Sequence, residues 1–375
     1  MAIVEEAQPG RSLRARAGSL VIQLAILAFV FGWLLPRFVD YQEVWNAIKG
    51  LSWWEFLILF ALGAARVPTE AMIYRALLPR LSSRVGSEAY LSQNFAGLVV
   101  PPPMSSIVQY AYFRSDGFER QASLVGAVGS FIFPTAGRLA LPLVAFAVLV
   151  VTGNFNPEAL WLAAASVAIL LVAAFVIWLV GRSDSSARWV GNQSGRAISW
   201  ALARFKKEPV TGLGETLVGF RNHTYQVVRD RWLSGAIAVS LNLFLTFVLL
   251  LVSLRFVGLS SDELEASAVL AALALAFLAG TILPITGSGL GTVDLVLISA
   301  LSTLSGNNDL SAAGAMVWRV FYSVLAVPFG VFTLNQFRKR HGALLTEAWT
   351  AVGDMREGIA ETEEFTMPEK AAMSG

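Results

Sequence analysis

Long apolar runs separated by shorter polar segments dominate the chain. Several of these runs reach about 20 residues, the length that an α-helix needs to cross a hydrocarbon core of about 30 Å. They cover residues 17–35, 53–78, 122–151, 159–180, 233–256 and 313–337. Each run is predicted to form a membrane-spanning helix. We therefore expect an all-α polytopic membrane protein with about six spanning helices.

Two further apolar stretches are interrupted by residues that break helices. Residues 88–115 contain three consecutive prolines that begin at Pro101. Residues 267–304 contain a proline and three alternating glycines, namely Pro284, Gly287, Gly289 and Gly291. The arms on either side of each break have roughly 11–16 residues, or about 16–24 Å of helix, which is too short to cross. Because such breaks are tolerated only inside protein or beside a water-filled cavity, we predict two oppositely facing re-entrant helical hairpins.

Lysine and arginine gather in three segments, at the N-terminus, in residues 181–231 and directly after the last apolar run. Cytoplasmic segments of membrane proteins carry an excess of these residues. Six spans and two hairpins place all three segments, and both termini, on the cytoplasmic side. If each hairpin were instead a full span, one basic segment would lie outside.

The same pattern divides the chain into segments. These are a cytoplasmic N-terminus (1–16), a first membrane half (17–180), a basic interfacial segment (181–231), a second membrane half (232–340) and a polar cytoplasmic tail (341–375). Each membrane half contains one of the predicted hairpins, at 88–115 and at 267–304, between two spans. This arrangement is that of an inverted repeat, in which broken helices at corresponding positions indicate the binding site of a transporter.

Composition agrees with this interpretation, because 55% of the residues are hydrophobic and only 14% are charged, against about 25% charged in soluble domains. Without cysteine the chain has no disulfide or thiol nucleophile, and His223 and His341 have no partners at metal-ligand spacing. The spans also contain no histidine or paired-carboxylate motif for acid–base chemistry. We therefore expect no catalytic residues, no cofactor and no metal site, and a protein that is not an enzyme.

Charged residues within the apolar runs are the candidates for function, because a charge at mid-bilayer costs about 2.5–3.5 kcal/mol unless it faces a cavity or a partner. Five candidates stand out, namely Arg66, Glu70, Arg138, Asp294 and Arg319. Arg66 and Glu70 lie one turn apart, so they form either a structural salt bridge or part of a binding site. Asp294 follows the second break, where it either caps a helix or pairs with Arg319. Arg138 has no local partner, and its guanidinium suits a lipid phosphate.

The order of these residues resembles the lysylphosphatidylglycerol synthase transmembrane-region family. The resemblance rests on Pro284, Gly287, Gly289, Gly291 and Asp294 followed by Arg319, on Asn94 followed by Pro101, and on Arg66. Two departures are visible, since Pro102 to Ser106 stand where the family tends to have Arg-Gly-Glu, and Asp294 replaces the usual glutamate. The resemblance implies a membrane domain that flips lipids, with stand-alone members that transport phospholipid or polyprenyl lipid. Only about 35 mostly polar residues follow the last span, so we do not expect a lysyl-transferase.

The sequence therefore predicts a lipid flippase or transporter of the prokaryotic cytoplasmic membrane. The residues that carry the resemblance, together with Glu70 and Arg138, are the expected contacts of an anionic or zwitterionic head group. Membrane lipids are the expected partners and nucleic acid is not, while a homo-oligomer and a partner in envelope biosynthesis both stay open. The alternatives are a non-transporting scaffold for a cell-envelope glycosyltransferase or lipid-modifying system and, least favoured by composition, an intramembrane enzyme.

Overall fold

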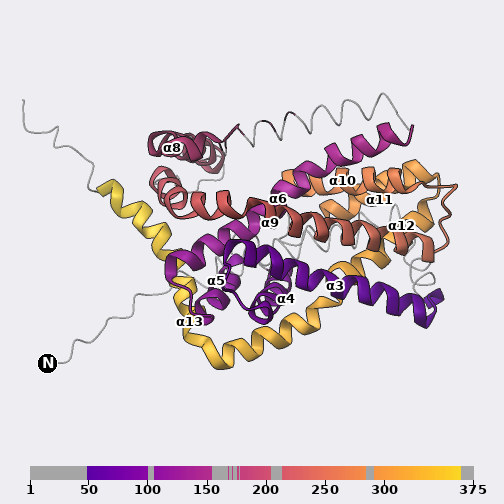
Figure 1. The fold of residues 1–375 in the computed structure, drawn as a ribbon, viewed down its shortest axis with the longest axis horizontal. Coiled ribbons are helices and arrows are strands. Elements are labelled where there is room, and N and C mark those ends of the chain that lie inside the picture. Colours follow the sequence, from indigo (N-terminus) through magenta and orange to yellow (C-terminus); the bar gives the residue numbers. More distant parts are fainter. Residues whose placement is uncertain are drawn as a thin grey trace, which may run out of the picture.

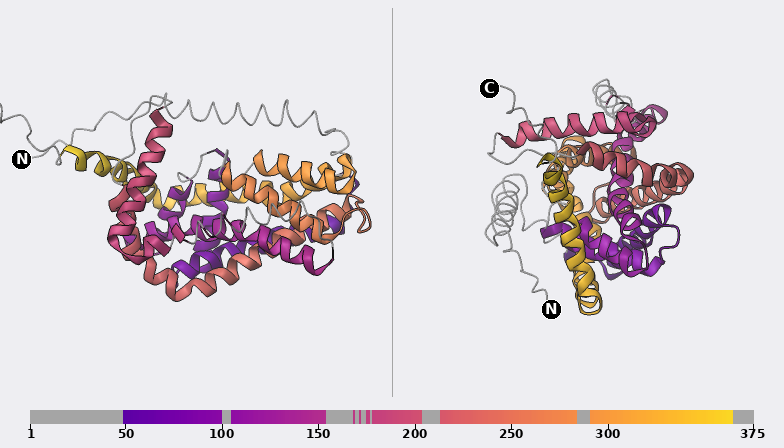
Figure 2. Two further views of the ribbon diagram at one scale, coloured as in Figure 1. Left: turned by 90° about the horizontal axis from the view of Figure 1, so that it is seen from above. Right: turned by 90° about the vertical axis from the view of Figure 1, so that its left-hand side faces the viewer.

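The computed structural model of the protein is an elongated helical assembly (Figures 1 and 2). It describes residues 49–99, 105–153, 168, 171, 175–176, 178–203, 213–283 and 291–364. All regular elements in these ranges are helices, as the sequence predicts. The expected span at 17–35 and most of the one at 159–180 lie outside the described residues, as do Pro101, Pro284, Gly287 and Gly289.

Long apolar helices form the frame of the molecule. They are α3 (Trp53–Leu77), α6 (Arg120–Val151), α9 (Leu213–Phe256) and the succession of α12 (Asn308–Arg319), η3 (Val320–Val324) and α13 (Ala326–Glu364). Within the described residues, four helical segments are long and apolar enough to cross a membrane. The four correspond to the predicted spans at 53–78, 122–151, 233–256 and 313–337. The protein is thus a multi-pass membrane protein, and the regular structure of its described residues is helical.

Shorter helices occupy the stretches that the sequence predicts to be broken. They are α4 (Ser83–Val99), α5 (Ser106–Ser115), α10 (Ala266–Ile282) and α11 (Thr292–Ser305). At 1.5 Å per residue these helices are only about 15–26 Å long. A further helix, α8 (Asp184–Ala203), belongs to the basic segment between the two halves and packs on the first part of α9.

The helices pack in two groups that have the same internal contacts. In the first group α4 packs on α3 and α5 on α6, and in the second group α10 packs on α9 and α11 on α12. The two groups also contact each other. The short helix α4 packs against α13 and the short helix α10 against α6, while α3 lies along α9 (Figure 1). Each pair of short helices is therefore enclosed by long helices of both groups.

Two of these helix contacts require glycine, because the backbones approach each other closely. A Cβ atom on Gly330 of α13 would lie 2.3 Å from the carbonyl oxygen of Leu91 in α4, and one on Gly63 of α3 would lie 2.6 Å from the carbonyl oxygen of Phe321. A side chain at either position would force the two backbones apart. The glycines therefore allow α13 and η3 to pack directly on the first group.

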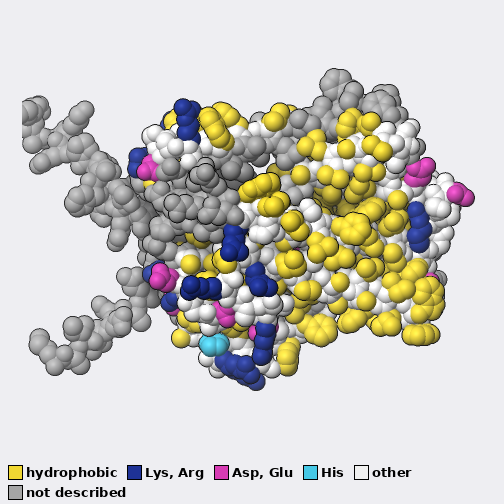
Figure 3. All heavy atoms as spheres, viewed as in Figure 1, with side chains coloured by type: hydrophobic (Ala, Val, Ile, Leu, Met, Phe, Trp, Pro, Cys, Tyr) yellow, Lys and Arg dark blue, Asp and Glu magenta, His cyan; other side chains and the backbone are white. Residues whose placement is uncertain are grey.

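Apolar side chains also cover much of the outer surface of the molecule, as Figure 3 shows. Large hydrophobic residues that point outward include Trp53, Phe244, Ile282 and Phe332, each more than half exposed. A soluble monomer rarely exposes a continuous apolar surface of this extent. The lysine and arginine side chains that are visible in Figure 3 gather mainly beyond one end of the apolar surface, which is the arrangement expected for helices embedded in lipid.

Candidate functional site

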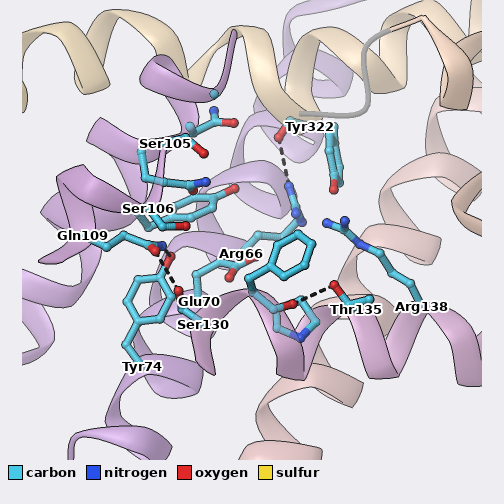
Figure 4. A pocket seen from close by; sticks show the side chains of 16 residues that line it. Arg66, Glu70, Tyr74, Ser105, Ser106, Gln109, Ser130, Thr135, Arg138 and Tyr322 are labelled. Carbon is cyan, nitrogen blue, oxygen red and sulfur yellow. Dashed lines mark hydrogen bonds between the residues drawn. The ribbon is translucent and has the colours of Figure 1, made fainter. Parts of the chain in front are cut away.

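A polar cavity lies inside the first group of helices, where η3 of the second group packs against it. The cavity has a volume of about 100 Å³ and is lined by residues of α3, α4, α5, α6 and η3 (Figure 4). Three of the intramembrane charges identified from the sequence, Arg66, Glu70 and Arg138, line it together with Asn94. The fold thus brings four predicted site residues from three different helices to one place.

Arg66 is held in the cavity wall by residues of the second group. Its side chain is 2% exposed. Nε donates to Oγ1 of Thr246 in α9, and Nη1 donates to the carbonyl oxygen of Tyr322 in η3, both at 2.9 Å. Although Arg66 and Glu70 are both in the described part of the chain, no ion pair joins them. The simple helical salt bridge that their spacing allows is therefore not what holds Arg66.

Glu70 is half-buried on the same face of α3 as Arg66. Its electrostatic neighbours are Arg66 and Arg138, and the side chain of Asn242 lies nearby. Figure 4 shows the guanidinium groups of Arg66 and Arg138 extending toward each other beside the ring of Tyr322. Two cations and one carboxylate leave the cavity with one positive charge in excess, so it is suited to an anionic group.

Hydroxyl and amide groups complete the polar lining opposite the arginines. Gln109 of α5 donates from Nε2 to the hydroxyl of Tyr74 at 2.7 Å, and its Oε1 accepts from Oγ of Ser130 at 2.6 Å. All three side chains are buried. These hydrogen bonds satisfy polar groups that burial would otherwise penalise, and they fix the position of α5 between α3 and α6.

The η3 segment is a π-helix, a form that leaves some backbone carbonyl groups without their usual helical partners. Side chains of the first group bind two of these carbonyls. Arg66 donates to the carbonyl of Tyr322, and Nδ2 of Asn94 donates to that of Ser323 at 3.1 Å. Asn94, which the sequence predicts as a head-group contact, thus also joins α4 to η3.

Asp294 and Arg319 form a buried ion pair outside this cavity. Oδ1 of Asp294 accepts from Nε of Arg319, and the two residues are 2% and 4% exposed. Oδ2 accepts from the backbone nitrogen of Gly291 at 3.0 Å, so Asp294 also caps the start of α11. Both interpretations left open by the sequence, the helix cap and the partner of Arg319, therefore hold at once.

The ring of Tyr322 contacts both Arg66 in the cavity wall and Arg319 of the buried ion pair. The guanidinium carbon of Arg66 lies 3.9 Å from its centroid and that of Arg319 lies 5.5 Å from it. Cations at such distances are attracted to the face of the ring. The buried ion pair and the cavity are therefore adjacent but separate, with Tyr322 in contact with both.

The chain matches the family described as "Lysylphosphatidylglycerol synthase TM region" over residues 20–330. The chain belongs to this family. The match includes the whole polar cavity and the Asp294–Arg319 pair, and it confirms the resemblance drawn from the motifs. No individually curated protein matches the chain.

Several residues that line the cavity of this lysylphosphatidylglycerol synthase TM-region protein were not identified from the sequence. The most important are Tyr322 and Tyr74, with Ser130 and Thr135 on α6. The spacing of polar residues in the sequence could have identified Tyr74 and Ser130. Arg66, Glu70 and Tyr74 follow each other at intervals of four residues on α3. Ser130, Pro134 and Arg138 do the same on α6. Residues spaced in this way share one face of a helix, and both of these faces line the cavity.

Proposed function

We propose that this lysylphosphatidylglycerol synthase TM-region protein transports a lipid across the cytoplasmic membrane of a prokaryote, and that the polar cavity receives the lipid head group. The observation that carries this proposal is the cavity itself, in which Arg66 and Arg138 lie within an otherwise apolar helical assembly. Charges at such a depth are costly and are retained where they serve a ligand or an ion. The transported molecule would be a phospholipid or a polyprenyl lipid.

The size of the cavity supports a head group rather than a whole lipid. A volume of about 100 Å³ is several times the 10–15 Å³ or so that one water needs on this measure. It accommodates a phosphate group with its nearest substituents. The acyl or prenyl chains would remain in the bilayer beside the exposed apolar faces of the helices.

Charge supports the same assignment. A phosphate diester carries one negative charge, which balances the single positive charge in excess among Arg66, Glu70 and Arg138. Guanidinium groups also bind phosphate oxygens through paired hydrogen bonds. A zwitterionic head group would place its phosphate against the arginines and its cation toward Glu70.

The packing of the helices supports the inverted repeat and the re-entrant hairpins of this proposal. The main helix contacts of the first group recur in the second when the helices are matched in chain order. The first group is α3, α4, α5 and α6, and the second is α9, α10, α11 and α12–α13. Each group packs its first short helix against the last long helix of the other group. The lengths of α5 and α11, 10 and 14 residues, are too short to cross a bilayer as single helices. The excess of basic residues favours both termini in the cytoplasm.

The proposal assigns no catalytic step to the chain. Among the described residues, the cavity lining combines the guanidinium groups of Arg66 and Arg138 with hydroxyl and amide groups suited to binding an anion. Lipids of the membrane are its proposed partners. A second copy of the chain, or a protein of envelope biosynthesis, is compatible with it. If the protein were a scaffold for such a system, the cavity would be a structural feature and no lipid would move.

Lipid movement in proteoliposomes made with the purified full chain tests the proposal. Phosphatidylglycerol, phosphatidylcholine and a polyprenyl phosphate, each labelled on an acyl or prenyl chain so that the head group is native, are placed in both leaflets. A membrane-impermeant reductant then bleaches the outer leaflet. We expect loss of the protected half of the signal with the wild-type protein but not with Arg138→Gln.

Arg182→Gln is the matched control, because Arg182 lies outside the cavity and its guanidinium contacts Trp178. It should transport like the wild type. Persistence of the protected signal for all three lipids with folded wild-type protein would reject transport. Such a result, with stable capture of an envelope enzyme, would support the scaffold.

A further inference from the structure

A second pocket lies on the surface near the start of α4, the end of α5 and the part of α13 around His341. Its volume is about 340 Å³. Its basic lining residues are Arg84, Arg340 and His341, and its only carboxylate among the described residues is Glu88, which pairs with Arg84 at 2.8 Å. The two arginines and the one carboxylate therefore leave the pocket with one positive charge in excess.

The second pocket is separate from the polar cavity because the two lie on different faces of α4. Arg84, Val85 and Glu88 line the second pocket, whereas Tyr90, Gln93, Asn94 and Gly97 line the cavity. At about 100° per residue, these two sets of positions point in roughly opposite directions from the helix axis. A ligand in one site would not occupy the other.

Stacked rings form the apolar wall of the pocket. Tyr112, which is fully buried, stacks on Phe337 with 4.0 Å between ring centroids, and Phe337 in turn contacts the ring of His341 at 5.2 Å. The hydroxyl of Tyr112 is fixed by Ser92, which also bonds to Thr333 of α13 at 2.8 Å. This network holds α4, α5 and α13 together, so the shape of the wall is set before any ligand binds.

One side of the pocket opens onto the apolar outer surface. Phe332 lines the pocket and is 62% exposed, and Phe329 and Val331 on the neighbouring turn of α13 are also exposed. The basic residues lie at the other side, where Arg338, Lys339 and Arg340 follow the last apolar run. A ligand that fits this boundary has an anionic group at one end and apolar chains at the other.

We propose that this pocket binds an anionic phospholipid of the surrounding leaflet as a resident, non-transported ligand. The phosphate would lie between Arg84, Arg340 and His341, and the acyl chains would follow Phe332 along α13. Basic pockets between helices at the membrane surface are a recurring means of binding anionic lipids. Because Arg84 has five N–H donors and its pair with Glu88 involves only Nε, it keeps donors for a phosphate. The proposal does not depend on transport through the cavity.

Native mass spectrometry of the full chain in detergent, titrated with phosphatidylglycerol, phosphatidylcholine or inorganic phosphate, tests the proposal. The titrations are made with the Arg138→Gln variant as background, so that the polar cavity contributes less to binding. We expect phosphatidylglycerol to bind more tightly than phosphatidylcholine. Arg340→Gln should weaken its binding about tenfold, the effect of losing one charge-assisted hydrogen bond.

Lys339→Gln is the matched control, since it removes the same charge from the adjacent residue of the same helix but does not line the pocket. It should retain binding within about twofold, on the scale of a surface charge. An equal loss in Lys339→Gln and Arg340→Gln would overturn the proposal in favour of diffuse attraction. Equally tight binding of inorganic phosphate, or no preference for phosphatidylglycerol, would also overturn it.

Discussion

The guanidinium carbon of Arg66 lies 3.9 Å from the centroid of the Tyr322 ring, while its Nη1 donates to the carbonyl oxygen of the same residue. One residue of the π-helix thus holds this arginine through both its ring and its backbone. Because the Tyr322 ring also contacts the guanidinium of Arg319, the position of the cavity arginine depends on the helix that carries the buried ion pair.

The contact between Arg66 and Tyr322 predicts that the ring contributes most of the interaction. Tyr322→Phe keeps the ring and removes only a hydroxyl near the Arg66 guanidinium, so it should slow transport less than a variant without the ring. Tyr322→Leu should lower the free energy of unfolding by roughly 0.5–2 kcal/mol, the range of a cation–π contact, and should slow transport. Thermal unfolding in detergent and the proteoliposome assay measure the two effects. Identical behaviour of the two variants would show that the ring face contributes nothing.

Arg138 should be required for transport but not for folding. Unlike Arg66, it is half-buried, and the buried ring of Phe277 that its guanidinium contacts is apolar and needs no polar partner. We expect Arg138→Gln to lower the transport rate at least about tenfold, the cost of one lost charge-assisted hydrogen bond. Its unfolding temperature should stay close to that of the wild type. Wild-type transport by this variant would remove Arg138 from the proposed pathway.

The pair of Asp294 and Arg319 predicts a strong energetic coupling between two residues. Loss of one partner leaves the other charge buried, so Asp294→Leu or Arg319→Met alone should cost about 3–5 kcal/mol. Replacement of both residues by apolar ones, as in Asp294→Leu with Arg319→Met, should cost less than the two single changes together. Thermal or denaturant unfolding of the four proteins gives the coupling energy. If the free-energy changes of the two single variants add up to that of the double variant, the ion pair contributes little to stability.

Gly330 should not tolerate even a methyl group. The Cβ atom of Gly330→Ala would lie 2.3 Å from the Leu91 carbonyl oxygen, and backbone atoms cannot move aside as a flexible side chain can. We expect a loss of about 1–3 kcal/mol in the free energy of unfolding, as for other overpacked sites.

Gly342→Ala is the control for this change, because Gly342 follows the kink of α13 at His341 and nothing lies within 4 Å of the added atom. It should be neutral or slightly stabilising, since alanine favours a helix more than glycine does. If both glycine variants unfold alike, the close approach of α13 to α4 is not important for stability.

The sequence predicted the long helices well, because the length of an apolar run determines whether a helix can cross a membrane. It also predicted both roles of Asp294, since a carboxylate directly after a helix break has few alternatives to capping or pairing. The first prediction depends only on neighbouring residues in the sequence. The second also depends on the requirement that a buried charge has a partner. The re-entrant course of the two hairpins stays a prediction, and their breaks lie outside the described residues.

The environment of Arg66 could not be predicted in this way. Its spacing from Glu70 indicated a pair within one helix, but its hydrogen-bond partners, Thr246 and Tyr322, come from positions 180 and 256 residues further along the chain. Such contacts depend on how α9 and η3 pack on α3. The four-residue spacing of polar positions on α3 and α6 does predict which faces meet at the cavity, once the two helices are known to be neighbours.

The π-helical turn at Val320–Val324 affects more than the residues that it contains. A π-turn adds one residue to a helical turn, so every later position is rotated by about 100° relative to an uninterrupted α-helix. The direction in which Gly330 faces α4, and that in which Phe337 faces Tyr112, are both set by this rotation. The extra residue therefore sets the rotation of the last long helix about its axis. Deleting it would turn the α13 wall of the second pocket away from α4 and α5, although no residue that lines the pocket would be changed.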